Sequence, residues 1–177
     1  MSRLAKNPIK FDPKVEVQLK DDRVHVKGPL GELDVKVMDG ITVEIKDNTV
    51  MVNRKDDTLR NFQGLVWSLI RNAVQGVTEG FSKTLVVQGK GWKSIVSGST
   101  IDLQVGFSHP VKFQVPREIK VTQENPGEFT LTSFDKQLLG ATVARIIRFR
   151  PVEPYKHKGI FIKGQYLRKK ERKQVGV

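Results

Sequence analysis

Lysine and arginine side chains gather at the C-terminal end of the chain, and their chemistry there is ionic contact with a polyanion. Residues 145–177 hold eleven Lys and Arg against two acids, which gives +9 of the chain's total charge of +12. Cations of one sign at this density repel one another, and the phosphates of a nucleic acid relieve that repulsion while releasing condensed counterions. The segment therefore predicts a nucleic-acid contact. The plainer alternative is a solvated tail that only aids solubility.

Glycines, prolines and tyrosines interrupt the same segment. Gly159 and Gly164 would let the backbone approach a phosphate closely. Tyr155 could stack on a base or sugar, as aromatic rings do in RNA sites, or pack equally well on its own domain. Arg145 and Arg148, with Arg150 as a further candidate, are spaced to share a helix face and extend the cationic surface onto the preceding helix.

A membrane is the other possible source of negative charge. The basic segment has no sustained apolar stripe, so it does not resemble an amphipathic membrane helix. The longest apolar runs fall far short of the roughly 20 residues that span a bilayer, and the first residues lack the apolar core of a signal peptide. We therefore expect no membrane partner and no signal peptide. The chain has no cysteine, which excludes disulfides and fits a reducing cytosol.

A glycine- and lysine-rich stretch occurs in the middle of the chain, at residues 89–93. It lacks the ending and the spacing of a phosphate-binding P-loop. We interpret it as a hairpin turn followed by a core residue, Trp92. Lys90 and Lys93 would then add peripheral contacts to phosphate.

Three histidines are the remaining candidates for chemistry, and none has a suitable neighbour in the sequence. No two of them have metal-ligand spacing. Ser108 and His109 are adjacent, but a catalytic pair is defined by spatial geometry, so we expect His109 to make a structural hydrogen bond in a loop. We predict no catalytic residue, no metal and no cofactor. An enzyme with a basic tail would need converging titratable groups, and the sequence indicates none.

The elements that must position these residues occur twice. Each half has short strands with apolar residues at every second position, followed by a helix with apolar residues at three- and four-residue spacings. Ile41-Thr42-Val43 corresponds to Ile119-Lys120-Val121, and Gly64 corresponds to Gly140 at nearly the same offset. We expect Phe62 and Trp67 of the first helix to lie in the core, and residues 56–58 to cap its start.

This repetition predicts an α+β fold with two similar small domains that arose by duplication. Each domain would consist of an antiparallel sheet of short strands packed with one helix. The expected limits are 1–82 and 83–152, followed by a basic extension at 153–177. The first 82 residues have a net charge of +1 and the remaining residues +11, so the second half is the expected polyanion-binding half.

Several motifs along the whole chain resemble those of bacterial large-subunit ribosomal protein six, the L-six family. The matching motifs are Val26-Lys27-Gly28-Pro29, Gly76-Val77-Thr78-Glu79-Gly80-Phe81, Gly106-Phe107-Ser108-His109-Pro110 and Glu153-Pro154-Tyr155-Lys156-His157-Lys158-Gly159-Ile160. The last resembles the family signature P-E-P-Y-K-G-K-G-I. His157 replaces the first of the two Gly residues in this signature, and a His tolerates a positive φ less easily than a Gly does.

The resemblance implies a structural, non-enzymatic component of the large ribosomal subunit in the cytoplasm. Family members bind large-subunit ribosomal RNA through the C-terminal domain and tail, near the base of the lateral stalk and the region where translation factors dock. The implied partners are this RNA, neighbouring large-subunit proteins and, transiently, translation factors. The implied RNA-binding residues are Tyr155, Lys156, His157, Lys158, Gly159, Lys163, Arg168, Lys169, Lys170, Arg172 and Lys173, with Arg148, Lys90 and Lys93 at the periphery.

A free regulatory protein that binds RNA or DNA is the alternative function. Such a protein would bind a short isolated element tightly and selectively. A ribosomal component would instead co-sediment with the large subunit.

Overall fold

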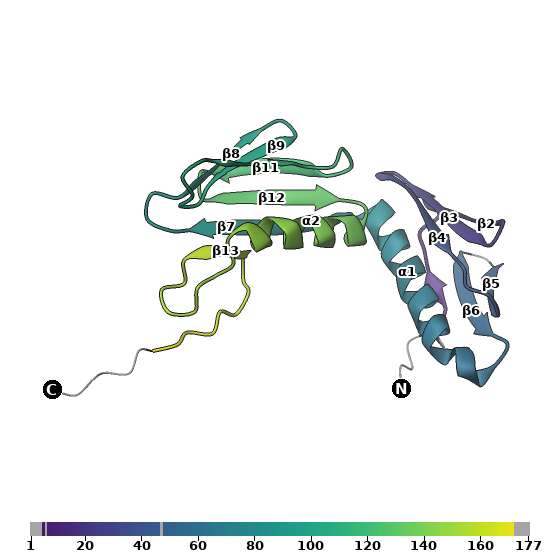
Figure 1. Cartoon of the computed structure of the whole chain (residues 1–177). Helices are drawn as coiled ribbons and strands as arrows, with labels where there is room; N and C mark the ends of the chain where they lie inside the picture. Colours follow the sequence, from purple (N-terminus) through teal and green to yellow (C-terminus); the bar gives the residue numbers. More distant parts are fainter. Residues whose placement is uncertain (1–4, 6, 47, 172–177) are drawn as a thin grey trace. The chain divides into compact units, whose positions relative to one another are not determined.

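The computed structural model describes residues 5, 7–46 and 48–171, and these form two compact units. Unit 1 consists of Met1–Phe81 and Phe134–Lys136, and unit 2 of Ser82–Ser133 and Gln137–Val177. Each unit is an α+β structure with antiparallel sheets and one long helix (Figure 1). Arg172 and Lys173, which the resemblance places in the RNA-binding set, lie outside the described residues.

Unit 1 contains two three-stranded sheets, with the strand orders β1-β6-β5 and β2-β3-β4. Its strands are β1 (Ile9–Lys10), β2 (Glu16–Lys20), β3 (Arg23–Gly28), β4 (Gly31–Lys36), β5 (Ile41–Lys46) and β6 (Thr49–Arg54). The strands are joined by tight turns. Asp21 and Asp22 between β2 and β3 both have positive φ, 43° and 59°. Two consecutive left-handed residues give the turn the twist that a two-residue hairpin needs.

Helix α1 (Arg60–Thr78) packs its apolar stripe against β3, β4 and β6 and closes the core of unit 1. Trp67 is buried, as the helical spacing predicted, and its indole Nε1 donates a hydrogen bond to the Asn7 carbonyl. The core assignment of Phe62 is wrong, because 43% of this residue is exposed. The expected side-chain cap is also wrong. The helix follows a 3₁₀ turn (Asp57–Leu59), and its N-cap residue is Leu59, without a side-chain cap bond.

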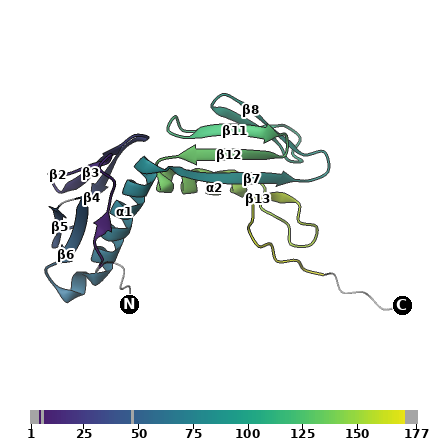
Figure 2. The same cartoon turned by 180° about the vertical axis from the view of Figure 1, so that it is seen from behind.

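Unit 2 repeats this arrangement with a three-stranded and a four-stranded sheet, ordered β10-β9-β8 and β11-β12-β7-β13. Helix α2 (Lys136–Phe149) covers one face of the four-stranded sheet and buries Leu139, Val143 and Ile146 (Figures 1 and 2). The strands are β7 (Phe81–Gln88), β8 (Lys93–Ser97), β9 (Thr100–Gln104), β10 (Val111–Gln114), β11 (Lys120–Asn125), β12 (Glu128–Ser133) and β13 (Gly159–Ile162).

The two strand orders show the duplication directly. Order β1-β6-β5 corresponds to β7-β12-β11, order β2-β3-β4 corresponds to β8-β9-β10, and α1 corresponds to α2. The predicted fold class is therefore confirmed. Strand β13 has no counterpart in unit 1. It pairs with β7, whereas β1, the equivalent of β7 in unit 1, pairs only with β6 among the described strands. The basic C-terminal segment is thus attached to the duplicated scaffold by a strand of its own.

Gly64 and Gly140 occupy the same position in their helices, four residues after the first residue of each. A Cβ at either site would meet no atom within 4 Å. We expect Gly64→Ala and Gly140→Ala each to raise the free energy of unfolding by about 0.5–1 kcal/mol, because Ala loses less backbone entropy than Gly in a helix interior. Urea unfolding measures the change. As a control, Gly76→Ala should destabilise, since its Cβ would lie 2.0 Å from the Phe134 carbonyl oxygen.

Within the described residues, neither α-helix combines the length and apolarity needed to cross a membrane.

Candidate nucleic-acid interface

Strand β13 fixes the start of the basic segment to the sheet of unit 2. It pairs antiparallel with β7, with Ile160 opposite Val87 and Ile162 opposite Leu85, and the Ile160 side chain is fully buried. Two backbone bonds extend the attachment: the Ile160 N–H donates to the Arg150 carbonyl, and the Lys163 N–H donates to the Thr84 carbonyl. The cations on either side of β13 are therefore presented from a hydrogen-bonded framework.

Between α2 and β13 the chain forms a closed loop at residues 153–158. The Glu153 N–H donates to the Lys158 carbonyl over 2.8 Å, and the His157 N–H donates to the Glu153 carbonyl over 2.9 Å. Lys156 and Lys158 project from this loop as exposed residues. The Lys170 N–H also donates to the Pro154 carbonyl, so the segment after β13 that carries further cations contacts this loop. The loop thus positions cations that are distant in the sequence close to one another.

His157 adopts the left-handed backbone conformation, with a φ of 54°. The family signature has Gly at this position, and the chain keeps the conformation even though a His occupies it. The imidazole is half-buried, and among the described residues its Nε2 atom has no hydrogen-bond partner. The substitution therefore leaves the loop geometry in place while it introduces both backbone strain and an unpaired polar atom.

We expect His157→Gly to be more stable than His157→Ala by about 1 kcal/mol. Both variants remove the imidazole, but only Gly removes the cost of about 1–2 kcal/mol that an L-residue with a side chain incurs in the left-handed region. Chemical denaturation of the two variants in parallel tests this. Equal stabilities would mean that the backbone at 157 relaxes to a negative φ.

Gly159 has a structural role that is independent of any ligand. It is buried, its φ is +154°, and a Cβ there would lie 2.4 Å from the Val152 Cα and 2.6 Å from the Val152 N. The close approach that it permits in the structure is to the chain's own backbone. A contact between Gly159 and phosphate stays a prediction.

All nine predicted RNA-binding Lys and Arg residues in the described part of the chain are exposed to solvent. Lys163 has a partner: its Nζ atom lies 2.8 Å from Glu128 Oε2. Arg148 lies in the last turn of α2, where a cation also suits the negative end of the helix dipole. The exposed members of the predicted set are Lys90, Lys93, Arg148, Lys156, Lys158, Lys163, Arg168, Lys169 and Lys170.

Aromatic rings accompany these cations. Tyr155 is 44% exposed, so part of this residue is open to solvent and the rest is covered by its own domain. Tyr166 is 89% exposed and follows β13 by four residues. Cations with interleaved aromatic rings match the chemistry of single-stranded RNA, whose phosphates need neutralising and whose bases need stacking partners.

The lysine-rich stretch at residues 89–93 forms the turn between β7 and β8. The prediction that its Trp92 is a core residue is wrong: the ring is half-buried, and the Arg150 guanidinium lies 5.7 Å from its centroid. His109 is exposed, and its Nδ1 atom lies 3.4 Å from Ser108 Oγ. The Arg150 guanidinium also lies 5.3 Å from the ring centroid of Phe107, so the turn, the loop that contains Phe107 and His109, and the residue after α2 meet at Arg150.

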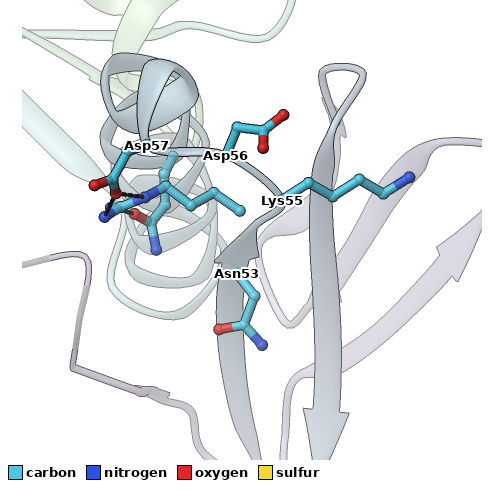
Figure 3. Close-up of a pocket in the computed structure, with 6 residues that line it drawn as sticks. Asn53, Lys55, Asp56 and Asp57 are labelled. Carbon is cyan, nitrogen blue, oxygen red and sulfur yellow. Dashed lines mark hydrogen bonds and ion pairs between the residues drawn. The ribbon is translucent and has the colours of Figure 1, made fainter.

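Unit 1 has a polar hollow of about 560 Å³ beside the start of α1 (Figure 3). In this hollow the Arg54 guanidinium donates hydrogen bonds to Asp57 and Gln63. Its Nη2 atom lies 2.5 Å from Asp57 Oδ1, and its Nη1 atom lies 2.6 Å from Gln63 Oε1. Lys55 extends away from this pair (Figure 3). Arg54 and Asp57 neutralise each other, and the lining residues include no nucleophile paired with a base. In the described ranges, no group of three or more His, Asp or Glu residues is arranged to hold a metal ion.

A duplicated α+β scaffold that presents cations and aromatic rings around its last strand is typical of the class of basic binding proteins. The family model described as Ribosomal protein L6 matches residues 13–80 and 87–161, one segment in each repeat. Large ribosomal subunit protein uL6 of Solidesulfovibrio magneticus is 44% identical over 99% of both chains. That of Chloroherpeton thalassium is 42% identical over 99% of both, and that of Thermotoga petrophila is 40% identical over 99% of this chain and 100% of its own.

The chain belongs to the ribosomal protein L6 family. It is accordingly a structural and non-enzymatic protein of the ribosome, located in the cytoplasm.

Proposed function

We propose that this protein is a component of the large ribosomal subunit and binds large-subunit ribosomal RNA through unit 2 and the segment that follows it. The observation that carries the proposal is β13, which attaches the most basic part of the chain to the sheet and leaves its cations exposed. The predicted domain limits, 1–82, 83–152 and 153–177, and the predicted RNA-binding residues are parts of this proposal.

The mechanism is electrostatic and steric. Lys156 and Lys158 neutralise crowded phosphates, and the loop at 153–158 fixes the distance between them. Tyr155 offers a ring on which an unstacked base can lie. Because the framework is hydrogen-bonded in the free protein, less conformational entropy is lost when RNA binds.

Unit 1 is assigned to protein contacts. Its sequence is nearly neutral, and α1 exposes two large apolar residues one turn apart, Phe62 and Leu65, which are 43% and 42% exposed. Apolar side chains on a neutral surface suit a neighbouring protein better than phosphate. We propose that these contacts lie near the base of the lateral stalk, close to the region where translation factors dock, as the resemblance implies. Crosslinking that attached unit 1 mainly to RNA would overturn this assignment.

Sedimentation tests the proposal as a whole. Tagged protein should co-sediment with the large subunit in sucrose gradients at moderate salt and dissociate only as the salt concentration rises. A free regulatory protein would stay at the top of the gradient and bind a short isolated element. That result would remove the ribosomal role.

A further inference from the structure

The rings of Trp92 and Phe107 and the guanidinium of Arg150 form a cluster in unit 2, which we call the ring cluster. The Arg150 Cζ atom lies 5.7 Å from the Trp92 ring centroid and 5.3 Å from that of Phe107. These residues come from the turn after β7, the loop after β9 and the residue after α2. Phe107 is 43% exposed and Arg150 is exposed, so the cluster lies at the surface.

Two glycines hold the indole in place. A Cβ on Gly89 would lie 2.3 Å from Trp92 Cδ2, and a Cβ on Gly106 would lie 3.1 Å from Trp92 Nε1. Gly106 also has a positive φ of 80°. The Trp92 ring therefore packs closely against two turns that contain no side chain at the contact. It is positioned before any ligand arrives.

A hollow of about 400 Å³ opens beside the rings, which is within the usual range of small-molecule sites, about 300–1,000 Å³. Its lining combines the two rings with Lys90, Gln104, Ser108 and His109. Lys90 supplies a cation for a phosphate. The Gln104 amide, the Ser108 hydroxyl and the His109 imidazole supply hydrogen-bond donors and acceptors for the edge of a base.

We propose that the ring cluster is a stacking site for one unpaired nucleotide of the bound RNA. Aromatic faces and an arginine plane are the groups on which splayed-out bases stack, and the hollow adds a cation and base-edge partners. Nucleic acid is favoured over an acidic peptide because a nucleotide uses both the aromatic rings and the cation that line the hollow, whereas a carboxylate uses only the charge. The inference rests on the proposed function, since it names a subsite for the same RNA.

The chain has two tryptophans, so Trp67→Phe leaves Trp92 as the single indole fluorophore. In this background we expect a single-stranded six-residue oligoadenylate to quench the fluorescence, and an abasic ribose-phosphate chain of equal length to leave it unchanged. Equal quenching by both chains would show that only phosphate contacts occur there. Quenching by neither would show that no base reaches Trp92. Either result overturns the site.

Phe107→Ala provides a second measurement on the full chain with deproteinised large-subunit RNA. Loss of one stacking partner should lower the affinity about tenfold, which corresponds to about 1.4 kcal/mol, and leave the salt slope unchanged. Ile95→Ala is the matched control, because Ile95 is an equally exposed apolar residue of unit 2, at 43%. It should bind normally. Circular dichroism confirms that both variants fold.

The outcomes separate the two proposals. Normal RNA binding by Phe107→Ala would overturn the stacking site and leave the proposed function intact. Failure of the unsubstituted chain to bind the RNA would overturn the proposed function and the stacking site together. A tenfold loss in the Ile95→Ala control as well would show a general surface effect, which also rejects the stacking site.

Discussion

Replacing Lys156 and Lys158 together by Gln is expected to flatten the salt dependence of RNA binding and to weaken it strongly at low salt. Each phosphate contact contributes about 0.9 to the slope of log affinity against log salt on a duplex-like site, so two contacts contribute about 1.8. If the two affinities converge at about 1 M salt, the loss at about 0.1 M is roughly 60-fold. Filter binding over a salt series measures both quantities.

The matched control replaces Lys10 and Lys14, two exposed lysines of unit 1, by Gln. This variant loses the same net charge but none of the proposed contacts, so its slope should equal that of the unsubstituted chain. An unchanged slope in the Lys156 and Lys158 variant would mean that these lysines do not meet phosphate. An equal change in both variants would mean that net charge alone determines binding.

Gly159→Ala is expected to be the most disruptive single substitution in the C-terminal segment. Its Cβ would lie 2.4–2.8 Å from backbone atoms of Val152 and Pro151, and backbone gives way less easily than the end of a flexible side chain. We expect a loss of about 3 kcal/mol in the free energy of unfolding, from overpacking and strain combined. Because Gly159 begins β13, the loss should appear as release of this strand from β7.

Amide hydrogen exchange locates the effect. The Ile160 and Lys163 amides, which donate to the Arg150 and Thr84 carbonyls, should lose protection in the Ala variant. RNA affinity should fall with them, since the neighbouring cations lose their framework. Gly164→Ala is the control: its φ is also positive, at 82°, but a Cβ there meets nothing within 4 Å, so it should cost only about 1 kcal/mol. Unchanged protection of Ile160 would contradict this account.

The duplicated fold was predictable because its signals are local. Alternation with a period of two identifies strands, a 3.6-residue period identifies helices, and the corresponding positions Gly64 and Gly140 fall at the same place in α1 and α2. Burial was less predictable. Helical spacing places Phe62 on the same side of α1 as Val66. It does not specify which turns of the helix the sheet buries.

The parts of the interface that sequence reasoning missed depend on long-range pairing. Gly159-Ile160-Phe161-Ile162 does not alternate, and its pairing with β7 joins residues more than 70 positions apart. The environment of Trp92 depends in the same way on Arg150, at the far end of the second repeat. The basic composition indicated which half of the chain to examine, and RNA binding by that half stays a prediction. The arrangement of individual cations required the tertiary structure.

The pairing of β13 with β7 has a consequence for biosynthesis. A chain emerges from N- to C-terminus, and domains generally fold in that direction as they are made. The whole duplicated scaffold up to α2 is therefore available before β13 appears, and the lysine loop closes only when this last strand joins the sheet. In a nascent chain the duplicated scaffold can thus form before the lysine loop that we propose as an RNA contact is closed.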